Sequence, residues 1–367
     1  MRMRLFFQFL CALLLLPAAV RAQEEIPYRM ALPGYKYAFP SDHGSHPDFK
    51  IEWWYYTGHV SSADGREFGY ELTFFRTGMD RSYANPSSWR VRELYMTHFA
   101  VTDITEKKFY YFEKINRAGP GIASAAAGTL DVSNENWLAR LEGNNIKLAA
   151  NAGTAAIELT LEPKKTPAIH GINGVSQKAD GAGRASHYYS MTRLSASGTL
   201  RLGSRTFRVA GDSWMDHEFG TNQLAENQAG WDWFSIQLDN GTDLMLYRMR
   251  HRDGSLDANS SGTIIEPDST TLHLRLAEFT ATGRRQWRSP NTGTSYPIEW
   301  TITITGRGAE LRLAPLVDDQ ELVTIRSTGI AYWEGAVEVI GTWEGRPVRG
   351  RGYVELTGYS ERHRPRI

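Results

Sequence analysis

Cysteine is almost absent from this sequence, and so is any excess of charge of one sign. The single cysteine among 367 residues is Cys11. It lies in an apolar leader, so the rest of the chain can form no disulfide, thiolate nucleophile or cysteine metal site. Basic and acidic residues both number 41, which leaves no basic field for nucleic acid. With 22% charged and 41% hydrophobic residues, the composition indicates a globular chain.

A long uncharged apolar run lies at the start, from Leu5 to Val20. Arg2 and Arg4 precede it, and Val20-Arg21-Ala22 provides small residues at the usual cleavage spacing. The pattern predicts a secretory signal peptide over residues 1–22, because the apolar core is short and polar sequence follows it. Removing its three arginines from the 41 basic residues leaves 38, against 41 acidic residues. We therefore expect an exported protein, located in the periplasm or secreted.

Strand patterns dominate the remaining chain. Residues 157–161 and 301–304 alternate apolar and polar side chains with period two, as half-buried strands do. Asp64-Gly65 and Asn240-Gly241 lie between apolar runs, which is the strongest short-range signal for a β-hairpin. Residues 135–141 are expected to form a short helix. The sequence predicts an all-β, antiparallel protein.

Two stretches of the sequence repeat. The aromatic hairpin at residues 53–76 matches that at 231–248, and residues 209–216 match 348–355 with valine, glycine, aromatic and acid at identical spacing. The repeats predict two related β-units, residues 23–221 and 222–367. A sheet of this size can hide its edges by closing into a barrel, and an eight-stranded barrel can hold one small ligand. Two barrels in tandem would also place a cleft between them, a common position for ligands.

Seven motifs follow one another along the chain: residues 42–49, 52–58, 97–100, 187–190, 211–220, 230–234 and 352–359. In these motifs the sequence resembles the AttH-like family, which includes the carotenoid 1,2-hydratases (hydroxyneurosporene synthases). The resemblance implies two consecutive lipocalin-like antiparallel β-barrels. It also implies a hydro-lyase that needs no cofactor and adds water across an isoprenoid double bond.

Asp216 is the first candidate for the acid of such a reaction. It lies in a Trp-x-Asp-His-Glu run, where the resemblance to hydratases places the acid. Protonating an alkene needs a carboxyl shielded from water, whose pKa is raised. The rings of Trp214, Tyr189 and Trp231 could stabilise the resulting cation. Alternatively, Asp216 caps a turn or pairs with an arginine, a reading that Glu355 at the matching position of the second unit favours.

Other candidates follow from strand alternation and residue type. Glu52, Trp54 and Tyr56 share one face of a strand, so Glu52 is either a carboxylate in a barrel lumen or an exterior charge. His98 and His187 either orient substrate or water, or are satisfied core histidines. The predicted catalytic residues are Asp216, His217 and Glu52. The predicted substrate-binding residues are Trp214, Tyr189, His187, His98, Trp54, Tyr56, Trp231 and Trp233.

Several further sites are weighed and set aside. Asp42, His43, His46 and Asp48 are expected to form a hydrogen-bonded loop rather than a metal site. Residues 211–213 resemble the start of a serine-esterase motif, but they lie in a predicted β-turn rather than on a strand-to-helix elbow. We expect no metal and no cofactor. The expected partner is a small hydrophobic or amphipathic molecule, with a membrane surface as a peripheral contact.

Three functions therefore remain open from the sequence. The first is a hydratase or lyase of the carotenoid 1,2-hydratase type. The second is a non-catalytic carrier of lipids or other hydrophobic ligands in the cell envelope. The third is a secreted hydrolase or cyclase on the same scaffold.

Overall fold

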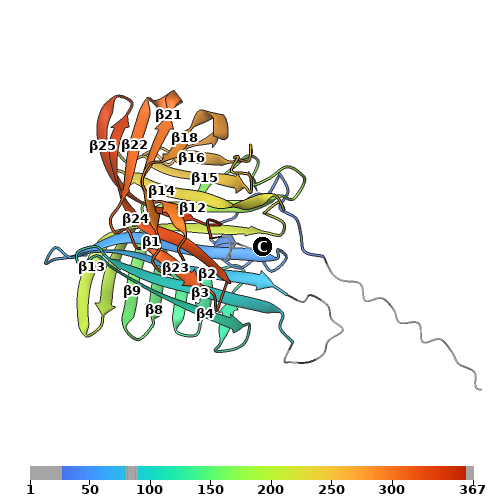
Figure 1. Ribbon diagram of the computed structural model, residues 1–367. Helices are drawn as coiled ribbons and strands as arrows, with labels where there is room; N and C mark the ends of the chain where they lie inside the picture. Colours follow the sequence, from blue (N-terminus) through green and yellow to red (C-terminus); the bar gives the residue numbers. More distant parts are fainter. Residues whose placement is uncertain (1–26, 80, 82–86, 88–89, 361–367) are drawn as a thin grey trace, which may run out of the picture.

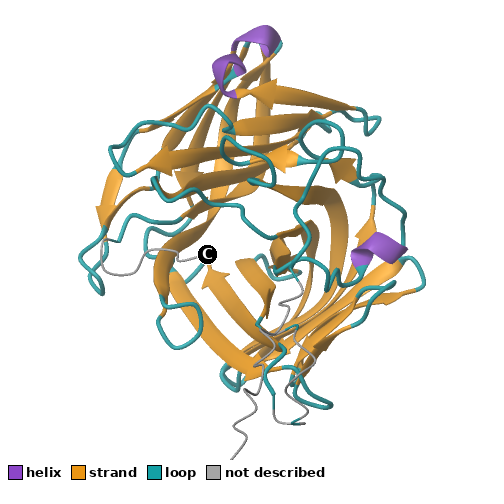
Figure 2. Cartoon of the chain, turned by 90° about the vertical axis from the view of Figure 1, so that its right-hand side faces the viewer, coloured by secondary structure: helices purple, strands orange, loops and turns teal. Residues whose placement is uncertain are grey.

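The computed structural model describes residues 27–79, 81, 87 and 90–360, so the predicted leader lies outside the described residues. Two curled antiparallel sheets, of thirteen and ten strands, are stacked on one another (Figures 1 and 2). The all-β prediction is confirmed. Among the described residues, no helix is both long enough and apolar enough to span a bilayer.

The first sheet has the order β4-β3-β2-β1-β13-β12-β9-β8-β7-β6-β5, with β10 and β11 beside β12. The 3-10 helix η1 (Ser41–His43) precedes it. Its strands are β1 (Ile51–Ser62), β2 (Glu67–Gly78), β3 (Glu93–Asp103), β4 (Lys108–Arg117), β5 (Ala123–Ala125), β6 (Asp131–Asn134), β7 (Trp137–Glu142), β8 (Asn145–Asn151), β9 (Ala155–Pro163), β10 (Ala168–Ile169), β11 (Ser176–Gln177), β12 (Ala185–Leu202) and β13 (Arg205–Gly220).

The second sheet has the order β17-β16-β15-β14-β25-β24-β22-β21-β18, with β23 beside β24. Strands β19 (Gln286–Arg288) and β20 (Ser295–Pro297) form a separate pair, and η2 (Leu276–Glu278) and η3 (Thr305–Arg307) are single turns. The strands of the sheet are β14 (Gln228–Leu238), β15 (Asp243–His251), β16 (Ser261–Ile265), β17 (Thr271–Arg275), β18 (Thr280–Gly283), β21 (Trp300–Ile304), β22 (Ala309–Pro315), β23 (Glu321–Thr324), β24 (Ile330–Trp343) and β25 (Arg346–Leu356).

The two sheets share one topology. Strands β1 and β2 form the predicted aromatic hairpin in the first sheet, and β14 and β15 form it in the second. The matching segments 209–216 and 348–355 lie on β13 and β25, each paired with the first strand of its hairpin. In the first sheet Asp216 is opposite Tyr55, and in the second Glu355 is opposite Trp233. The repeated sequence therefore occupies equivalent places in the two sheets.

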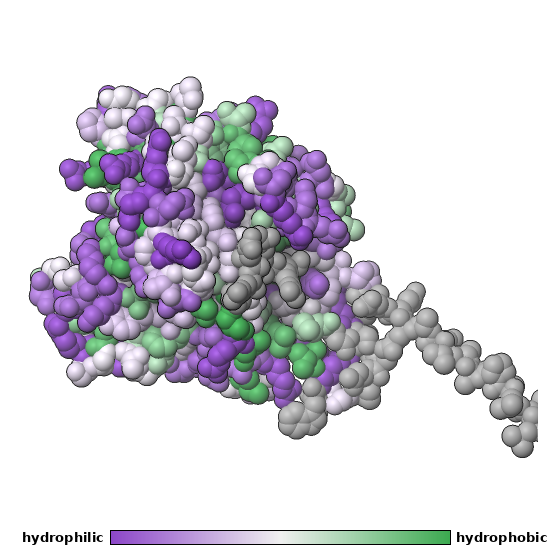
Figure 3. All heavy atoms as spheres, viewed as in Figure 1, coloured by the Kyte–Doolittle hydropathy of each residue, from purple (hydrophilic) through white to green (hydrophobic). Residues whose placement is uncertain are grey.

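Each sheet curls into a nearly closed barrel that is filled by side chains. The Asn116 side chain on β4 donates to Asn134 Oδ1 on β6 at 2.7 Å, across the gap left in the first sheet. Trp54, Tyr56 and Trp137 belong to the apolar core inside the first barrel, and the second barrel has a core of its own. A further buried cluster joins the barrels through their outer faces, and includes Tyr55, Tyr188, Trp214, Trp233, Met245, Tyr247 and Tyr353. The surface seen in Figure 3 is mostly hydrophilic, with smaller hydrophobic areas.

Two local predictions are wrong. Residues 135–141 do not form a helix: Glu135 takes a left-handed turn with φ 55°, and β7 follows from Trp137 with alternating burial. The predicted turn at residues 211–213 is the middle of β13, paired on both sides. A Cβ at Gly211 would lie 2.0 Å from the carbonyl oxygen of His59. Glycine is needed here because the neighbouring strand lies too close for a side chain, and not because the chain turns.

Candidate functional site

The predicted residues separate into two groups because successive residues of a strand point to opposite faces. On β13, Trp214 and Asp216 face the second barrel, whereas His217 faces the end of the first barrel and contacts Glu52 at 2.9 Å. We call the region around Asp216, Tyr188, Ser190, Trp214 and Trp233 the inter-barrel site.

Asp216 is the centre of the inter-barrel site and is 3% exposed. Tyr188 Oη donates to its Oδ2 at 2.7 Å, Trp214 Nε1 donates to its Oδ1 at 2.7 Å, and Ser190 Oγ also donates to Oδ1. Within the described part of the chain it forms no salt bridge. Burial raises the pKa of Asp216 to about 7, although the three hydrogen bonds act in the opposite direction. A carboxyl of this kind can hold its proton near neutral pH.

Aromatic rings from both barrels surround this carboxyl. Trp233 Nε1 donates to Tyr188 Oη at 3.0 Å, and the Trp233 ring meets those of Tyr55 and Trp214 edge-on, with centroids 5.1 and 6.4 Å apart. Trp231 is partly buried beside the cluster. Its Nε1 donates to Glu355 Oε2 at 2.8 Å. Trp214, Trp231 and Trp233 therefore lie at the interface between the barrels, and their role in binding substrate stays a prediction.

Three further carboxyls lie at the same interface, of which Glu71 and Glu334 are buried and Glu355 is partly buried. Glu334 on β24 and Glu355 on β25 are cross-strand neighbours, and Tyr55 Oη donates to Glu334 Oε1 at 2.6 Å. Glu71 on β2 accepts from Thr73 Oγ1 at 2.8 Å. Burial raises the pKa of Glu71 to about 7 and that of Glu355 to about 8, and burial together with Glu355 and Glu71 raises the pKa of Glu334. Sequence reasoning missed Glu71 and Glu334, because it could not show which strand faces meet between the barrels.

A histidine that the sequence analysis did not single out is connected to Asp216 through a serine. His170 Nε2 lies 2.6 Å from Ser190 Oγ, and His170 Nδ1 lies 2.9 Å from Thr263 Oγ1 of the second barrel. Burial lowers the pKa of His170 well below its ordinary value. A neutral imidazole at this place fixes the orientation of the Ser190 hydroxyl against Asp216.

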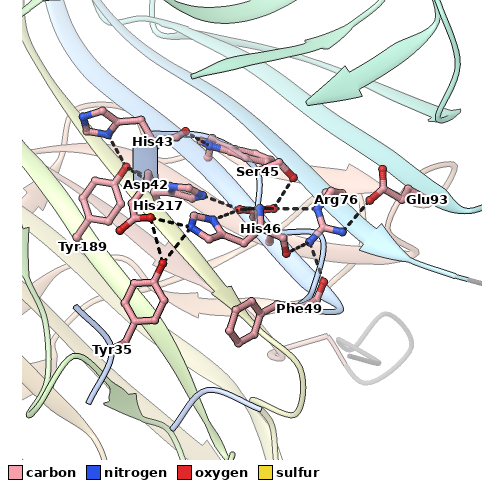
Figure 4. Close-up of polar contacts among 12 residues, drawn as sticks. Tyr35, Asp42, His43, Ser45, His46, Phe49, Arg76, Glu93, Tyr189 and His217 are labelled. Atoms are coloured by element: carbon pink, nitrogen blue, oxygen red, sulfur yellow. Dashed lines mark hydrogen bonds and ion pairs between the residues drawn. The ribbon is translucent and has the colours of Figure 1, made fainter. Parts of the chain in front are cut away.

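Glu52 belongs to a second group, which we call the barrel-end cluster: Glu52, Arg76, His46, His217 and Ser45. Glu52 is fully buried in the first barrel and paired with Arg76 Nε at 2.8 Å. Ser45 Oγ donates to it at 3.0 Å, and His46 Nδ1 and His217 Nε2 lie 2.8 and 2.9 Å from its Oε1. Figure 4 shows the side chains of His46, His217 and Arg76 converging. Glu52 is thus a lumen carboxylate rather than an exterior charge.

The barrel-end cluster has the residue types of a metal site. His46, Glu52 and His217 each offer a ligand atom within 4.8 Å of the others, and such a set could hold a transition-metal ion. Here, however, Arg76 balances the charge of Glu52. Although burial opposes it, hydrogen bonds from His217 and His46 and the Arg76 guanidinium hold the pKa of Glu52 well below its ordinary value. The network is complete without an ion and fastens the segment before β1 to the barrel.

The remaining predicted residues lie away from Asp216. Tyr189 Oη contacts His43 Nδ1 at 2.7 Å and His217 Nδ1 at 3.1 Å, so the expectation that its ring faces Asp216 is wrong. Alternation on β12 instead turns Tyr188 toward Asp216. His187 Nδ1 lies 2.7 Å from the Gly174 carbonyl oxygen, at the same barrel end. Trp54 and Tyr56 are buried in the first core.

His98 lies between the barrels but is satisfied by protein groups. Its Nδ1 is 2.6 Å from Tyr332 Oη and its Nε2 is 3.0 Å from Ser327 Oγ. Burial lowers the pKa of His98 to about 3. The structure favours the reading of His98 as a core histidine that joins the two barrels.

Comparisons with known proteins agree with this architecture. The family model described as AttH-like matches residues 30–359. A crystal structure from Nitrosomonas europaea that carries the AttH name is 35% identical, covers 91% of this chain and 100% of its own, and has a TM-score of 0.82. Kievitone hydratase from Nectria haematococca is 17% identical over 91% of this chain and 99% of its own, with a TM-score of 0.70.

A curated relative extends the comparison. The dehydratase asqC of Emericella nidulans is 21% identical over 280 residues, which cover 70% of this chain and 75% of that protein. The resemblance drawn from the motifs is confirmed, and this chain belongs to the AttH-like family.

Proposed function

We propose that this protein is a hydratase or dehydratase that needs no cofactor and acts on a carbon–carbon double bond of a hydrophobic substrate, with Asp216 as the acid. The observation that carries the proposal is a buried carboxyl held by three uncharged donors among rings from both barrels. The names of two relatives, a hydratase and a dehydratase, support this class of reaction. An isoprenoid alkene, as in the carotenoid 1,2-hydratases, is the proposed substrate class.

The chemistry follows from the contacts of Asp216. In hydration, its carboxyl gives a proton to the less substituted carbon, and the π electrons form the new C–H bond. The adjacent carbon becomes a tertiary cation, which the ring faces of Trp214 and Trp233 stabilise. Water then forms the C–O bond and loses a proton, so that the net change is the addition of one water. Dehydration is the same sequence reversed.

A substrate has to reach this buried carboxyl between the barrels. The apolar cluster at the interface is only partly buried at Trp53, Leu224, Trp231 and Leu316. We propose that the partly buried surface at Trp231, whose indole donates to Glu355, forms the entrance. Opening it requires a small separation of side chains, as in many enzymes whose closed state excludes water.

The test compares Asp216→Asn with Asp212→Asn, a control on the exposed part of the same strand. Both proteins are incubated with neurosporene in oxygen-18 water, and the products are analysed by mass spectrometry. Asn keeps the shape but cannot supply the proton, so we expect kcat to fall by about 100-fold or more for Asp216→Asn only. Solvent extraction of the purified protein, followed by mass spectrometry, identifies any hydrophobic molecule that it carries.

Other outcomes would contradict the proposal. Retention of neurosporene without oxygen-18 incorporation by the unaltered protein would indicate a carrier. A rearranged product without added oxygen would indicate a cyclase. Export through the predicted leader is a separate proposal, tested by fractionating cells that express the full chain.

A further inference from the structure

We infer that Glu334 and Glu71 together bind the reactant water and take its proton, so that the reaction uses a carboxyl pair facing the acid across the barrel interface. The inference deepens the proposed function and rests on it. Addition of water needs a group that accepts a proton as well as one that donates it.

The two glutamates lie on different barrels and face the same interface. Glu334 is 1% exposed and Glu71 is 2% exposed. Tyr332, two residues before Glu334 on β24, donates to Glu71 Oε1 at 3.4 Å. Tyr55 donates to Glu334 and is the cross-strand neighbour of Asp216. Tyr55 therefore links the pair to the proposed acid: its hydroxyl contacts Glu334, and its backbone lies opposite that of Asp216.

One oxygen of each glutamate is unpaired. Glu334 Oε2 and Glu71 Oε2 are buried and have no hydrogen-bond partner among the described residues. Buried carboxyl oxygens are almost always hydrogen-bonded, and leaving one without a partner is costly. A water molecule between the barrels would satisfy both atoms, since water can donate to the unprotonated oxygen and accept from a protonated one. That water would be held near the face of the cation formed at Asp216.

The charges at the interface also favour a proton-accepting pair. Within the described part of the chain, neither Glu71 nor Glu334 forms a salt bridge with a basic side chain. The titratable groups near the pair are the carboxyls Glu355 and Asp216, the tyrosines Tyr55, Tyr332 and Tyr353, and His98, whose Nδ1 contacts Tyr332. Two close carboxyls without a cation share protons rather than ionise together. Such a pair can accept the proton that water loses as the C–O bond forms. That proton is given back to Asp216 after the product leaves, so that each turnover restores both groups.

The repeated architecture accounts for the position of the proposed acid opposite the proposed proton acceptors. Asp216 and Glu355 occupy the same place in the two sheets, and Glu334 is the cross-strand neighbour of Glu355. Because the barrels pack through these equivalent faces, the acid of one is set against carboxyls of the other.

The first experiment is a crystal structure of the full chain at high resolution. We expect an ordered water within hydrogen-bond distance of both Oε2 atoms, and its loss or displacement in Glu334→Gln. Direct hydrogen bonding of the two Oε2 atoms to each other or to protein groups, with no water between them, would overturn the inference. This measurement needs no substrate.

The second experiment measures turnover of neurosporene by Glu334→Gln and Glu71→Gln. The control is Glu338→Gln, an exposed position on the same strand β24. We expect kcat to fall by about 100-fold in the two interface variants, with KM changed less than about twofold, because the groups act on water rather than on the alkene. The control should keep the unaltered kcat.

The pattern across variants separates the two claims. Loss of activity in Asp216→Asn with full activity in Glu334→Gln and Glu71→Gln would overturn the carboxyl pair and leave the proposed function standing. Full activity in Asp216→Asn would overturn the proposed function, and with it this inference.

Discussion

Replacing Asp216 with asparagine should stabilise the protein at alkaline pH while removing its activity. The folded protein holds the proton of Asp216 up to about pH 7, whereas the unfolded chain releases it near 3.8. Between these values the folded state binds more protons than the unfolded state. Raising the pH through this window therefore lowers the free energy of unfolding of the unaltered protein.

The size of the effect follows from the shift in pKa. A change from 3.8 to about 7 is roughly three units, and each unit corresponds to about 1.36 kcal/mol, so the full penalty is about 4 kcal/mol above pH 8. About 3 kcal/mol of it should appear between pH 5 and pH 8.5. Asparagine avoids this penalty but accepts fewer hydrogen bonds from Tyr188, Ser190 and Trp214, at a cost of about 1–3 kcal/mol. The net gain at pH 8.5 is then about 1–3 kcal/mol.

Urea denaturation at pH 5 and pH 8.5 measures this directly. The difference in stability between Asp216→Asn and the unaltered protein should rise by about 3 kcal/mol between the two pH values. The exposed Asp212→Asn variant should show no such change. Parallel dependence on pH in the unaltered protein and Asp216→Asn would refute the raised pKa, and with it the reasoning that the acid is protonated near neutral pH.

Three further predictions concern the inter-barrel site around Asp216 and the barrel-end cluster around Glu52. Tyr188→Phe removes a donor that favours the charged form of Asp216, so the pH above which kcat falls should rise by about one unit in a pH–rate profile; an unchanged profile would contradict this. Glu52→Gln should lower the free energy of unfolding by about 3 kcal/mol, because Arg76 loses a buried charge partner, whereas exposed Glu338→Gln should change it by less than about 0.5 kcal/mol in urea titrations. Chelator treatment should leave the thermal midpoint unchanged, because Arg76 already balances Glu52; a clear decrease in scanning calorimetry would show that the barrel-end cluster holds a metal.

Much of the fold could be predicted because its signals are local. The Asp64-Gly65 and Asn240-Gly241 turns each join two aromatic strands, as predicted, and strict alternation placed Glu52, Trp54 and Tyr56 on one face. The error at residues 135–141 arose because a short segment of mixed polarity fits either period. Only pairing of β7 with β6 and β8 decides that it is a strand.

The site was harder to predict because it depends on which faces of the two sheets pack together, and these sheets are formed by segments far apart in the sequence. The sequence could identify Asp216 by its neighbours, but it could not show that Tyr188 rather than Tyr189 faces it. That choice depends on the register between β12 and β13, where Ser190 lies opposite Asp216. Glu71 and Glu334 became candidates only through packing of the barrels, which brings together residues more than 250 positions apart.

The interface between the barrels also bears on how such a protein could arise. The proposed catalytic groups stand on the outer walls of the two repeats, so a single repeat would carry half a site and expose Tyr55, Trp214 and their apolar neighbours to water. An ancestor with one repeat would have needed to self-associate through this wall to hide it. Fusion of two copies into one gene would then have let the halves diverge, with aspartate retained on one side and glutamate on the other.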